Sequence, residues 1–335
     1  MSKILSIVIP TYNMEKYLQR CLDSLVIEDR YLFEQIEILV INDGSKDRSL
    51  EIAQSYQEKF PSVFRAIDKK NGNYGSCINK GLAEATGMFF RILDADDWFD
   101  QEALQTVVKA LISGQDTFDF VLTNYRAIDV NGTIQDYAEV NMPKGQLDFD
   151  SFRFINTPNE RLLVMHSITF KTSLLHDVGL KHQEGISYTD IEYCYYPLTT
   201  AKSFCYIDAT LYQYYIGREG QTVSVESTLA HYNDYYKVAL RATNDYLLRE
   251  KDFSSERKES LCRIIYNPIV SYYRVLLLNK KVLTQDDTQQ LSLLDSCVNK
   301  VPMLYNRLVK ATYRKIPFIL IWKKFNIRIA KIIGR

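Results

Sequence analysis

Apolar runs alternate with segments of helical spacing over the first 123 residues of the chain. Runs rich in apolar residues predict strands at residues 4–9, 36–41, 63–67, 88–93 and 118–123. Between these runs, apolar residues three and four apart predict helices at residues 15–26, 47–60, 76–85 and 101–113. Repeated strand–helix–strand units of this kind favour an α/β fold with a mostly parallel sheet and helices on both faces.

The pattern changes twice beyond residue 123. Residues 124–225 are mixed, with a hairpin signal at residues 129–132, a strand at 164–170 and a helix at 189–198. From residue 226 the spacing is helical, with helices predicted at 232–249, 256–278, 286–298 and 316–335. We therefore expect one domain over residues 1–225, built from halves 1–123 and 124–225, followed by a helical region at 226–335.

Three carboxylates follow the strand predicted at residues 88–93, namely Asp94, Asp96 and Asp97. Like charges this close raise one another's pKa, so the chain alone gains nothing from the cluster. A divalent cation such as Mg²⁺ or Mn²⁺ would resolve the repulsion, because it takes carboxylate oxygens as ligands. The alternative is an acidic loop that caps the helix predicted from residue 101.

Two other strand ends carry similar loops. Pro10-Thr11-Tyr12-Asn13 ends the first strand, and Asn42-Asp43-Gly44-Ser45 ends the second. Ligands of open α/β sheets bind outside the carboxyl ends of the strands, so the three loops suggest a shared site. The glycine fingerprints of dinucleotide-binding folds and of P-loops do not occur, so a phosphate-bearing ligand would need a metal here.

These segments, with Asn73-Tyr74-Gly75 and Asn79-Lys80-Gly81, resemble glycosyltransferase family 2 in order and spacing. The resemblance is specific over residues 4 to about 115, weaker to about 224, and absent beyond. It implies a GT-A fold and an inverting transfer from a nucleotide-diphosphate sugar, most often a UDP-sugar, with a Mn²⁺ or Mg²⁺ ion. The lipid-linked saccharides of cell-surface polysaccharide synthesis are common acceptors in this family.

The resemblance also implies roles for single residues. The metal would be held by Asp96 and Asp97, and the nucleotide-sugar by Pro10, Thr11, Tyr12, Asn13, Asp43, Asn73, Gly75, Asn79, Asp94, Asp96 and Arg218. Tyr12 is the candidate to stack on the base, and Asp43 the candidate to hydrogen bond it. Each role has an ordinary alternative: a tyrosine at the rim, a turn-forming aspartate, or an arginine in a solvated loop.

An inverting transfer needs a general base for the acceptor hydroxyl. The family places this carboxylate near the start of a late helix, a position occupied here by Asp190. Thr189 precedes it where an acid is usual, so Glu192 remains a rival, and Asp190 could simply cap its helix. His166 lies on the strand predicted at 164–170 and is a candidate for the acceptor pocket, although a lone histidine is often structural.

Charge is distributed unevenly along the 335 residues. The formal net charge is zero, but no Asp or Glu follows Asp295, and the 40 residues of this tail carry ten Lys or Arg. As a helix, residues 316–335 would place aromatic and aliphatic side chains opposite basic ones, a pattern typical of helices that lie in an anionic membrane interface. A helix docked on the protein, or a homodimer through the C-terminal helices, are the alternatives. Nucleic acid is not expected, because the first 295 residues have a net charge of −10.

The six cysteines show no metal or disulfide spacing, and neither a signal peptide nor a membrane-spanning run is found. We therefore expect a cytoplasmic protein, peripheral on the inner face of the cell membrane. The leading hypothesis is an inverting glycosyltransferase. A metal-dependent nucleotidyltransferase would instead bind triphosphates, and a non-catalytic sugar-nucleotide-binding protein would be indifferent to loss of Asp190.

Overall fold

A computed structural model of the chain describes residues 3–114, 117–138, 142–143, 145–151, 162–218, 220–221 and 224–331. The chain forms two compact units, residues 1–219 and 220–335. Each unit is described separately. Among the described helices, none combines the length and the apolar character that crossing a bilayer requires.

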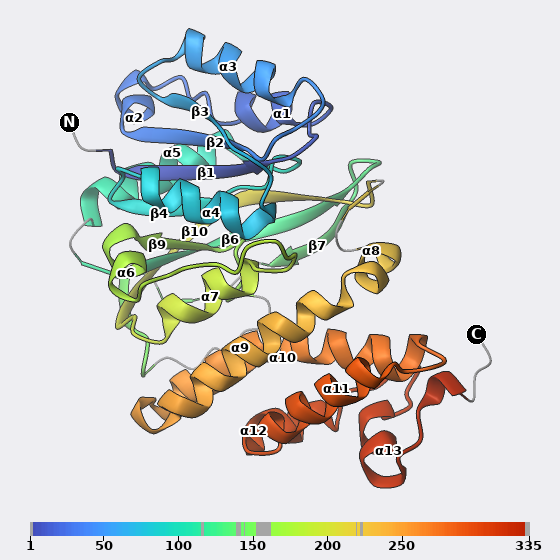
Figure 1. Cartoon of the computed structure of the whole chain (residues 1–335). Coiled ribbons are helices and arrows are strands. Elements are labelled where there is room, and N and C mark those ends of the chain that lie inside the picture. Colours follow the sequence, from blue (N-terminus) through green and yellow to red (C-terminus); the bar gives the residue numbers. More distant parts are fainter. Residues whose placement is uncertain are drawn as a thin grey trace. The chain divides into compact units, whose positions relative to one another are not determined.

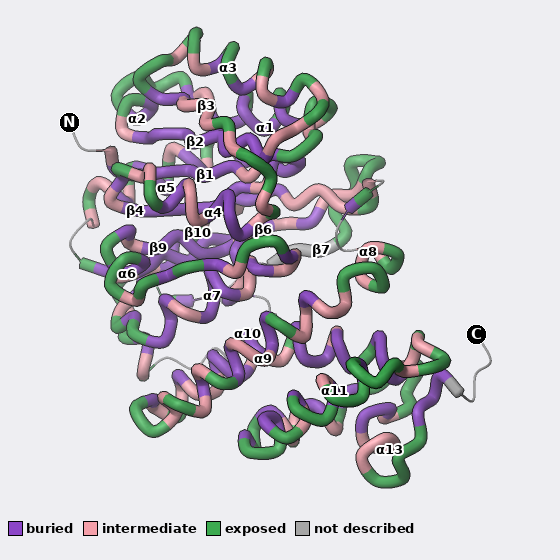
Figure 2. The backbone as a smooth tube through the Cα atoms, viewed as in Figure 1, coloured by how far each residue is buried: buried purple, intermediate pink, exposed green. Residues whose placement is uncertain are grey.

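The first unit is built around a mixed sheet of ten strands, whose central members are buried (Figures 1 and 2). The path β3-β2-β1-β4-β9-β6-β10-β5 orders eight of them, while β7 pairs with β6 and β8 with β10. The strands are β1 (Leu5–Thr11), β2 (Ile36–Asn42), β3 (Phe64–Asp68), β4 (Phe89–Ile92), β5 (Trp98–Phe99), β6 (Phe120–Asp129), β7 (Ile134–Ala138), β8 (Gly145–Asp148), β9 (Ile168–Lys171) and β10 (Ser203–Ile216).

Seven helices accompany this sheet in the described part of the first unit. They are α1 (Leu18–Asp23), α2 (Arg30–Glu34), α3 (Ser49–Lys59), α4 (Asn73–Glu84), α5 (Gln101–Gly114), α6 (Thr172–Asp177) and α7 (Asp190–Leu198). Helix α4 lies in front of the sheet and α5 behind it in the view of Figure 1. Strand β2 is buried along its whole length, as expected of a strand covered on both faces.

The predicted α/β fold with a mostly parallel sheet is confirmed. Strands β3, β2, β1 and β4 pair in parallel, and so do β6 and β10. Strand β9 runs antiparallel between β4 and β6, which leaves β6 pointing the same way as β4. The carboxyl ends of β1, β2 and β4 therefore meet at one edge of the sheet.

Helix α4 packs unusually close to β1 because it presents a glycine there. A Cβ on Gly81 would lie 2.4 Å from Cγ1 of Val8, which is fully buried in the middle of β1. The glycine thus lets the helix backbone approach the strand, and it brings the first turn of α4 beside the ends of β1 and β4.

Several elements differ from the sequence-based expectation. Strand β10 was not predicted, because two register shifts between residues 207 and 212 break the alternation of apolar and polar positions. Strands β5 and β8 and helices α2 and α6 were also missed. The hairpin predicted at residues 129–132 is confirmed, since β6 and β7 pair on either side of it.

The second unit is helical, as predicted. Its elements are α8 (Val225–Ala230), α9 (Tyr232–Arg249), the short 3₁₀ turn η2 (Glu250–Asp252), α10 (Ser255–Arg274), the π-helical turn η3 (Val275–Asn279), α11 (Gln285–Val298), α12 (Pro302–Leu308), α13 (Phe318–Phe325) and the 3₁₀ turn η4 (Ile329–Lys331). A capping box formed by Thr284 and Asp287 starts α11.

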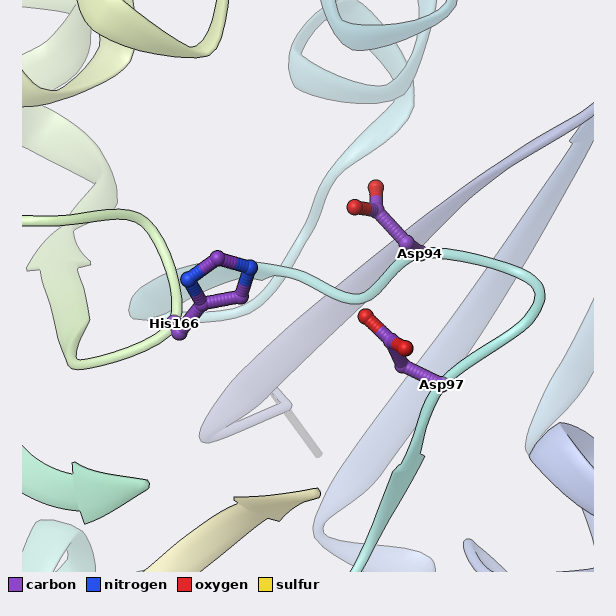
Figure 3. A group of neighbouring side chains, drawn as sticks. All are labelled: Asp94, Asp97 and His166. Carbon is purple, nitrogen blue, oxygen red and sulfur yellow. The ribbon is translucent and has the colours of Figure 1, made fainter. Parts of the chain in front are cut away.

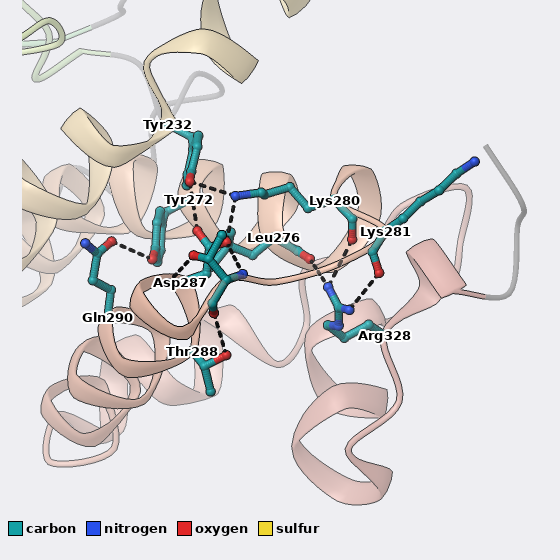
Figure 4. A network of polar contacts seen from close by, with 10 residues as sticks. Tyr232, Tyr272, Leu276, Lys280, Lys281, Asp287, Thr288, Gln290 and Arg328 are labelled. Carbon is teal, nitrogen blue, oxygen red and sulfur yellow. Dashed lines mark hydrogen bonds and ion pairs between the residues drawn. The ribbon is translucent and has the colours of Figure 1, made fainter.

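A polar network ties the end of α10 to α11 and to the last described residues (Figure 4). The Lys280 ammonium donates to the Tyr232 hydroxyl at 2.7 Å and to Oδ2 of Asp287 at 2.6 Å. The buried Arg328 donates to the carbonyls of Leu276, Lys280 and Lys281 at 3.2, 3.0 and 2.9 Å. A cation at this position satisfies carbonyl groups that the helix end leaves without partners.

The prediction of one helix over residues 316–335 is therefore wrong. Helix α13 ends at Phe325, because Asn326 takes a left-handed conformation with φ 54°. Arg328, placed by the sequence on a solvent-exposed basic face, is instead buried with Ile329 and Ala330. Residues 332–335 of that prediction lie outside the described residues.

Candidate active site

The loops after β1 and β2 are joined by reciprocal hydrogen bonds. The backbone N–H of Asn13 donates to Oγ of Ser45 at 3.0 Å, and the N–H of Lys46 donates to Oδ1 of Asn13 at 2.8 Å. Asn13 has φ 54°, in the left-handed region that asparagine tolerates better than most residues. This clamp leaves the neighbouring Tyr12 46% exposed at the rim.

The other two residues of this segment are held more tightly. Thr11 is buried, and its hydroxyl donates to the carbonyl of Ile9 in the same strand at 3.1 Å. Pro10 is partly buried next to it. Of the four residues predicted here for nucleotide binding, Tyr12 is thus the one with a large side chain open to a ligand.

Asp43 is buried at the end of β2 with one carboxylate oxygen committed. Its Oδ1 accepts from the Lys69 ammonium at 2.5 Å and from the backbone N–H of Gly72 at 3.0 Å. Burial, and then the charge of Asp43, raise the pKa of the neighbouring Cys77 thiol on α4. Lys69 is itself oriented by Ser76, on the first turn of α4, at 2.7 Å.

Asp94, Asp97 and His166 converge where β4 ends (Figure 3). One possible ligand atom from each lies within 4.8 Å of the others. The two aspartates belong to the loop that follows β4, while His166 belongs to the segment that leads into β9 (Figure 3). The chain thus brings together an imidazole and two carboxylates that are about 70 residues apart in sequence.

The electrostatics of this cluster suit a cation. Burial, and then the charge of Asp96, raise the pKa of Asp94 and of Asp97 above the ordinary range of a carboxyl. Burial and the nearby Arg91 lower the pKa of His166 to about 3, so its imidazole stays neutral, the form that binds metals. A donor set of two carboxylates and a neutral imidazole fits a divalent ion such as Mn²⁺.

Asp96, which was predicted to hold the metal with Asp97, has a different partner. Its carboxylate forms an ion pair with the guanidinium of Arg218, and both side chains are nearly buried. The backbone carbonyl of Asp96 accepts a hydrogen bond from the guanidinium of Arg20 at 2.8 Å. This guanidinium lies 3.9 Å from the centre of the Trp98 ring. In the structure it is Asp94, and not Asp96, that joins Asp97 and His166 in the group of possible metal ligands.

Asp190 is the first residue of α7 and faces the acid cluster. Burial raises its pKa to about 6, and its charge in turn raises the pKa of Asp94. Tyr74 interacts with both: its hydroxyl donates to Oδ1 of Asp94 at 2.8 Å, and burial, followed by the charges of Asp94 and Asp190, raises its pKa. The residue two positions before Asp190, Tyr188, has a left-handed φ of 62°, which is costly for a bulky side chain.

Glu192, the rival base, is two residues further along α7. It is buried, and it accepts from the backbone N–H and the side-chain amide of Gln183 at 2.8 and 2.9 Å. Its described bonds therefore hold the segment that precedes α7.

Three residues of α4 that were predicted to bind the nucleotide-sugar lie at or near the contacts between α4 and the segment before α7. Asn79 donates to the carbonyl of His182 at 3.0 Å and accepts from the His182 N–H at 2.8 Å. A Cβ on Gly75 would lie 2.2 Å from the carbonyl oxygen of Gln183, so only glycine allows this contact. Asn73 starts α4 with a left-handed φ of 64°. Through these contacts α4 positions the start of α7.

Sequence reasoning missed four residues that shape the site. Tyr74 lies inside the segment that carries the family resemblance, but without a role in it. Arg91 lies in the strand predicted at residues 88–93 and Arg20 in the helix predicted at residues 15–26, and neither had a predicted role. Tyr212 had no signal, because β10 was not predicted; its hydroxyl donates to Oδ2 of Asp97 at 2.7 Å.

Comparisons with known proteins agree with this architecture. The sequence model of glycosyl transferase family 2 matches residues 6–175. Poly(ribitol-phosphate) beta-N-acetylglucosaminyltransferase TarS of Staphylococcus aureus (strain MW2) is 24% identical over 314 residues, which are 93% of this chain and 52% of TarS. EpsH of Bacillus subtilis (strain 168), described as a glycosyltransferase, is 27% identical over 341 residues, covering 94% of this chain and 93% of EpsH.

A solved structure, that of S. aureus TarS 1–349 in complex with UDP-GlcNAc, matches with a TM-score of 0.68 at 21% identity. The match covers 99% of this chain and 91% of that one, and it confirms the predicted GT-A fold. The chain spans about half the length of the full TarS sequence. Because the family model covers slightly more than half of its residues, the chain belongs to glycosyl transferase family 2.

Proposed function

We propose that this chain is an inverting glycosyltransferase that moves a sugar from a nucleotide-diphosphate sugar to a saccharide acceptor. The observation that carries the proposal is that Asp190 faces the acid cluster after β4 closely enough to perturb the pKa of Asp94. A general base opposite a cation site is the arrangement that direct displacement at a sugar carbon requires.

Asp190 has the properties of the base. With a pKa near 6 it is largely ionised at neutral pH, yet it binds a proton more tightly than an ordinary carboxylate. In the reaction the acceptor oxygen forms a bond to the anomeric carbon, the bond from that carbon to the diphosphate breaks, and the hydroxyl proton passes to Asp190. Glu192 would support this step by holding the segment before α7.

The loops after β1 and β2 would hold the nucleotide. The buried carboxylate of Asp43 at the end of β2 is a hydrogen-bond acceptor, and uracil presents an N–H donor at N3. The exposed ring of Tyr12 lies on the adjoining loop and offers a stacking surface. The solved complex of TarS with UDP-GlcNAc supports a UDP-sugar as the first donor to test.

Asp94 and Asp97 would hold a divalent cation, Mn²⁺ or Mg²⁺, which when bound neutralises charge on the departing diphosphate. Arg218, now paired with Asp96, is the second cationic group available for that diphosphate.

The test is a panel of sugar nucleotides incubated with Mn²⁺ and scored for donor hydrolysis by mass spectrometry. We expect a UDP-sugar to be consumed, and Asp190→Asn to reduce its transfer to a saccharide acceptor. Lack of binding and turnover of every sugar nucleotide would refute the proposal. Binding of nucleoside triphosphates instead would point to a nucleotidyltransferase, and an unchanged Asp190→Asn variant to a binding protein.

We further propose that the acceptor is lipid-linked and that residues 314–327 contact an anionic membrane from the cytoplasmic side. Around α13 the side chains of Ile316, Phe325 and Ile327 are exposed, by 38, 67 and 43%. Arg314, Lys315 and Lys324 are exposed among them. Apolar side chains interspersed with cations suit the interface of a negatively charged leaflet.

Flotation of the full chain with phosphatidylglycerol vesicles tests this surface. Replacing Phe325 and Ile327 with serine should abolish flotation, while the same change at the exposed Leu248, which is on α9 in a different neighbourhood, should not. Equal flotation of the double variant and the unchanged chain would refute the proposal. Light scattering on the same samples tests the homodimer expected as an alternative use of the C-terminal helices.

A further inference from the structure

We propose that Tyr212 is a positioning residue that assembles Asp94, Asp97 and His166 into one cation site before any nucleotide arrives. This inference rests on the function proposed above, but concerns a property of the chain without substrate. Tyr212 lies on β10 and is fully buried. It is the described residue that touches all three members of the cluster.

The hydroxyl of Tyr212 bridges the two aspartates. It accepts from the backbone N–H of Asp94 at 3.2 Å and donates to Oδ2 of Asp97 at 2.7 Å. The other oxygen of Asp97 accepts from the backbone N–H of Tyr215, also on β10, at 2.7 Å. Both carboxylate oxygens of Asp97 are thus oriented by β10, and the loop that carries Asp94 is attached to the same strand.

The ring of Tyr212 holds the third member. It meets the imidazole of His166 edge to face, with 4.7 Å between the ring centres, and Tyr214 stacks on the same imidazole at 4.4 Å. None of the residues that the structure describes forms a hydrogen bond with a ring nitrogen of His166. The ring contacts orient this imidazole, and its nitrogens beside two carboxylates are available to coordinate a cation.

Arg91 fixes the backbone of this ligand from the other side. Its buried guanidinium, in the middle of β4, donates to the carbonyl of His166 at 2.5 Å and to Oγ1 of Thr169 at 2.7 Å. The segment before β9 is therefore tied to the strand whose end carries both aspartates. Burying a guanidinium without a carboxylate partner costs free energy. A role in holding the backbone of His166 explains why Arg91 is present despite this cost.

A set of ligands held this way needs no reorganisation when a cation binds. The chain should accordingly bind Mn²⁺ in the absence of nucleotide, with one nitrogen and two carboxylates as ligands. Groups that orient metal ligands through hydrogen bonds typically contribute about 10–100-fold to metal affinity. We expect a loss in this range when the Tyr212 hydroxyl is removed.

The experiment titrates the full chain with Mn²⁺ alone and follows bound ion by electron paramagnetic resonance, with electron spin echo modulation to detect a coordinated ¹⁴N. Tyr212→Phe keeps the ring and removes the bridge. Tyr193→Phe is the matched control, since Tyr193, on α7, is equally buried but donates to the backbone carbonyls of Phe90 and Ile168. His166→Gln tests the nitrogen ligand, and does not depend on the folding of the tyrosine variants.

We expect Tyr212→Phe to bind Mn²⁺ about 10–100-fold more weakly, Tyr193→Phe to bind it as the unchanged chain does, and His166→Gln to lose the nitrogen modulation. Absence of saturable Mn²⁺ binding by the unchanged chain, absence of a nitrogen coupling, or equal affinity in Tyr212→Phe would each overturn the inference. The sugar-nucleotide panel is scored independently. Turnover without the nitrogen coupling would reject this inference alone, and the coupling without turnover of any donor would reject the proposed function alone.

Discussion

Asp190→Asn separates catalysis from stability in this chain. Burial raises the pKa of Asp190 from 3.8 to about 6, so the folded chain holds the ionised carboxylate at a cost. At about 1.36 kcal/mol per pKa unit, this shift corresponds to about 3 kcal/mol as an upper figure. The cost is absent below the unfolded pKa, grows as the pH rises between the two values, and is complete above the folded pKa of about 6.

Asparagine keeps the shape of the side chain but cannot ionise. The variant should therefore unfold at higher denaturant, with a gain of up to about 3 kcal/mol at pH 8 and roughly half of that at pH 5, where the carboxylate is only partly ionised in the folded chain. At the same time the transfer rate should fall by about 10²–10⁴-fold, because the base is lost. A more stable and less active protein is the signature of a strained catalytic group.

Glu192→Gln is the matched comparison, because it removes a charge two residues away. Glu192 accepts two hydrogen bonds from Gln183, and an amide can accept only with its single oxygen. Loss of a hydrogen bond to a charged group costs about 1.5–3 kcal/mol. This variant should therefore be less stable than the unchanged chain, which is the opposite sign to Asp190→Asn.

Urea unfolding, followed by the fluorescence of Trp98, measures the free energy of unfolding of the first unit. The only other tryptophan, Trp322, is changed to Phe in every sample. Transfer is measured on the same preparations with the donor found in the sugar-nucleotide panel. If Asp190→Asn lost stability as Glu192→Gln does, or kept its transfer rate, the assignment of Asp190 as a buried base would be wrong.

Three further changes have defined outcomes. Gly75→Ala would place a Cβ 2.2 Å from the carbonyl oxygen of Gln183, so it should displace the segment before Asp190 and lower kcat while UDP binding, measured by calorimetry, is kept. Arg328→Ala removes the donor to three carbonyl groups at the end of α10 and η3, and should destabilise the second unit by at least about 1.5 kcal/mol, measured by urea unfolding with Trp322 fluorescence. For the unchanged chain, kcat should fall about tenfold per pH unit below about pH 6, because Asp190 becomes protonated and cannot accept the acceptor proton.

Each of these has a control. Gly132→Ala, at a φ of +79°, strains the β6–β7 hairpin but meets no atom within 4 Å, and it should leave kcat unchanged. Lys324→Ala removes an exposed cation near Arg328 in sequence, and equal destabilisation by both would contradict the capping role. A pH profile of UDP binding that fell in parallel with kcat would assign the acidic limb to the donor site and not to Asp190.

The sequence was sufficient for the parts of the site that depend on local pattern. The runs that became β1, β2 and β4 each end in turn-forming polar residues, and parallel strands bring their carboxyl ends to one edge. Asp43, Asp94, Asp97 and Asp190 were placed near the site for this reason or by family resemblance. Family membership and the GT-A fold follow from the same segments.

Local pattern was misleading where a distant partner decides the conformation. The periodicity of residues 316–335 is that of a single helix, but the left-handed Asn326 ends α13 and Arg328 is bound by carbonyl groups about 50 residues earlier. The gain from capping the end of α10 and η3 outweighs the preference of this segment for a continuous amphipathic helix.

The partners of the three carboxylates in the acid cluster also depend on tertiary structure. Among three adjacent carboxylates, sequence alone did not distinguish Asp94 from Asp96. In the folded chain Arg218 approaches Asp96, while Tyr212 on the irregular strand β10 reaches the loop at Asp94 and Asp97. These partners are more than 100 residues away in sequence, and only the pairing of β10 with β6 and β5 brings them to the site. The functional groups of the site could thus be predicted from local sequence. The partner of each carboxylate, in contrast, depends on which distant side chains the sheet brings next to it.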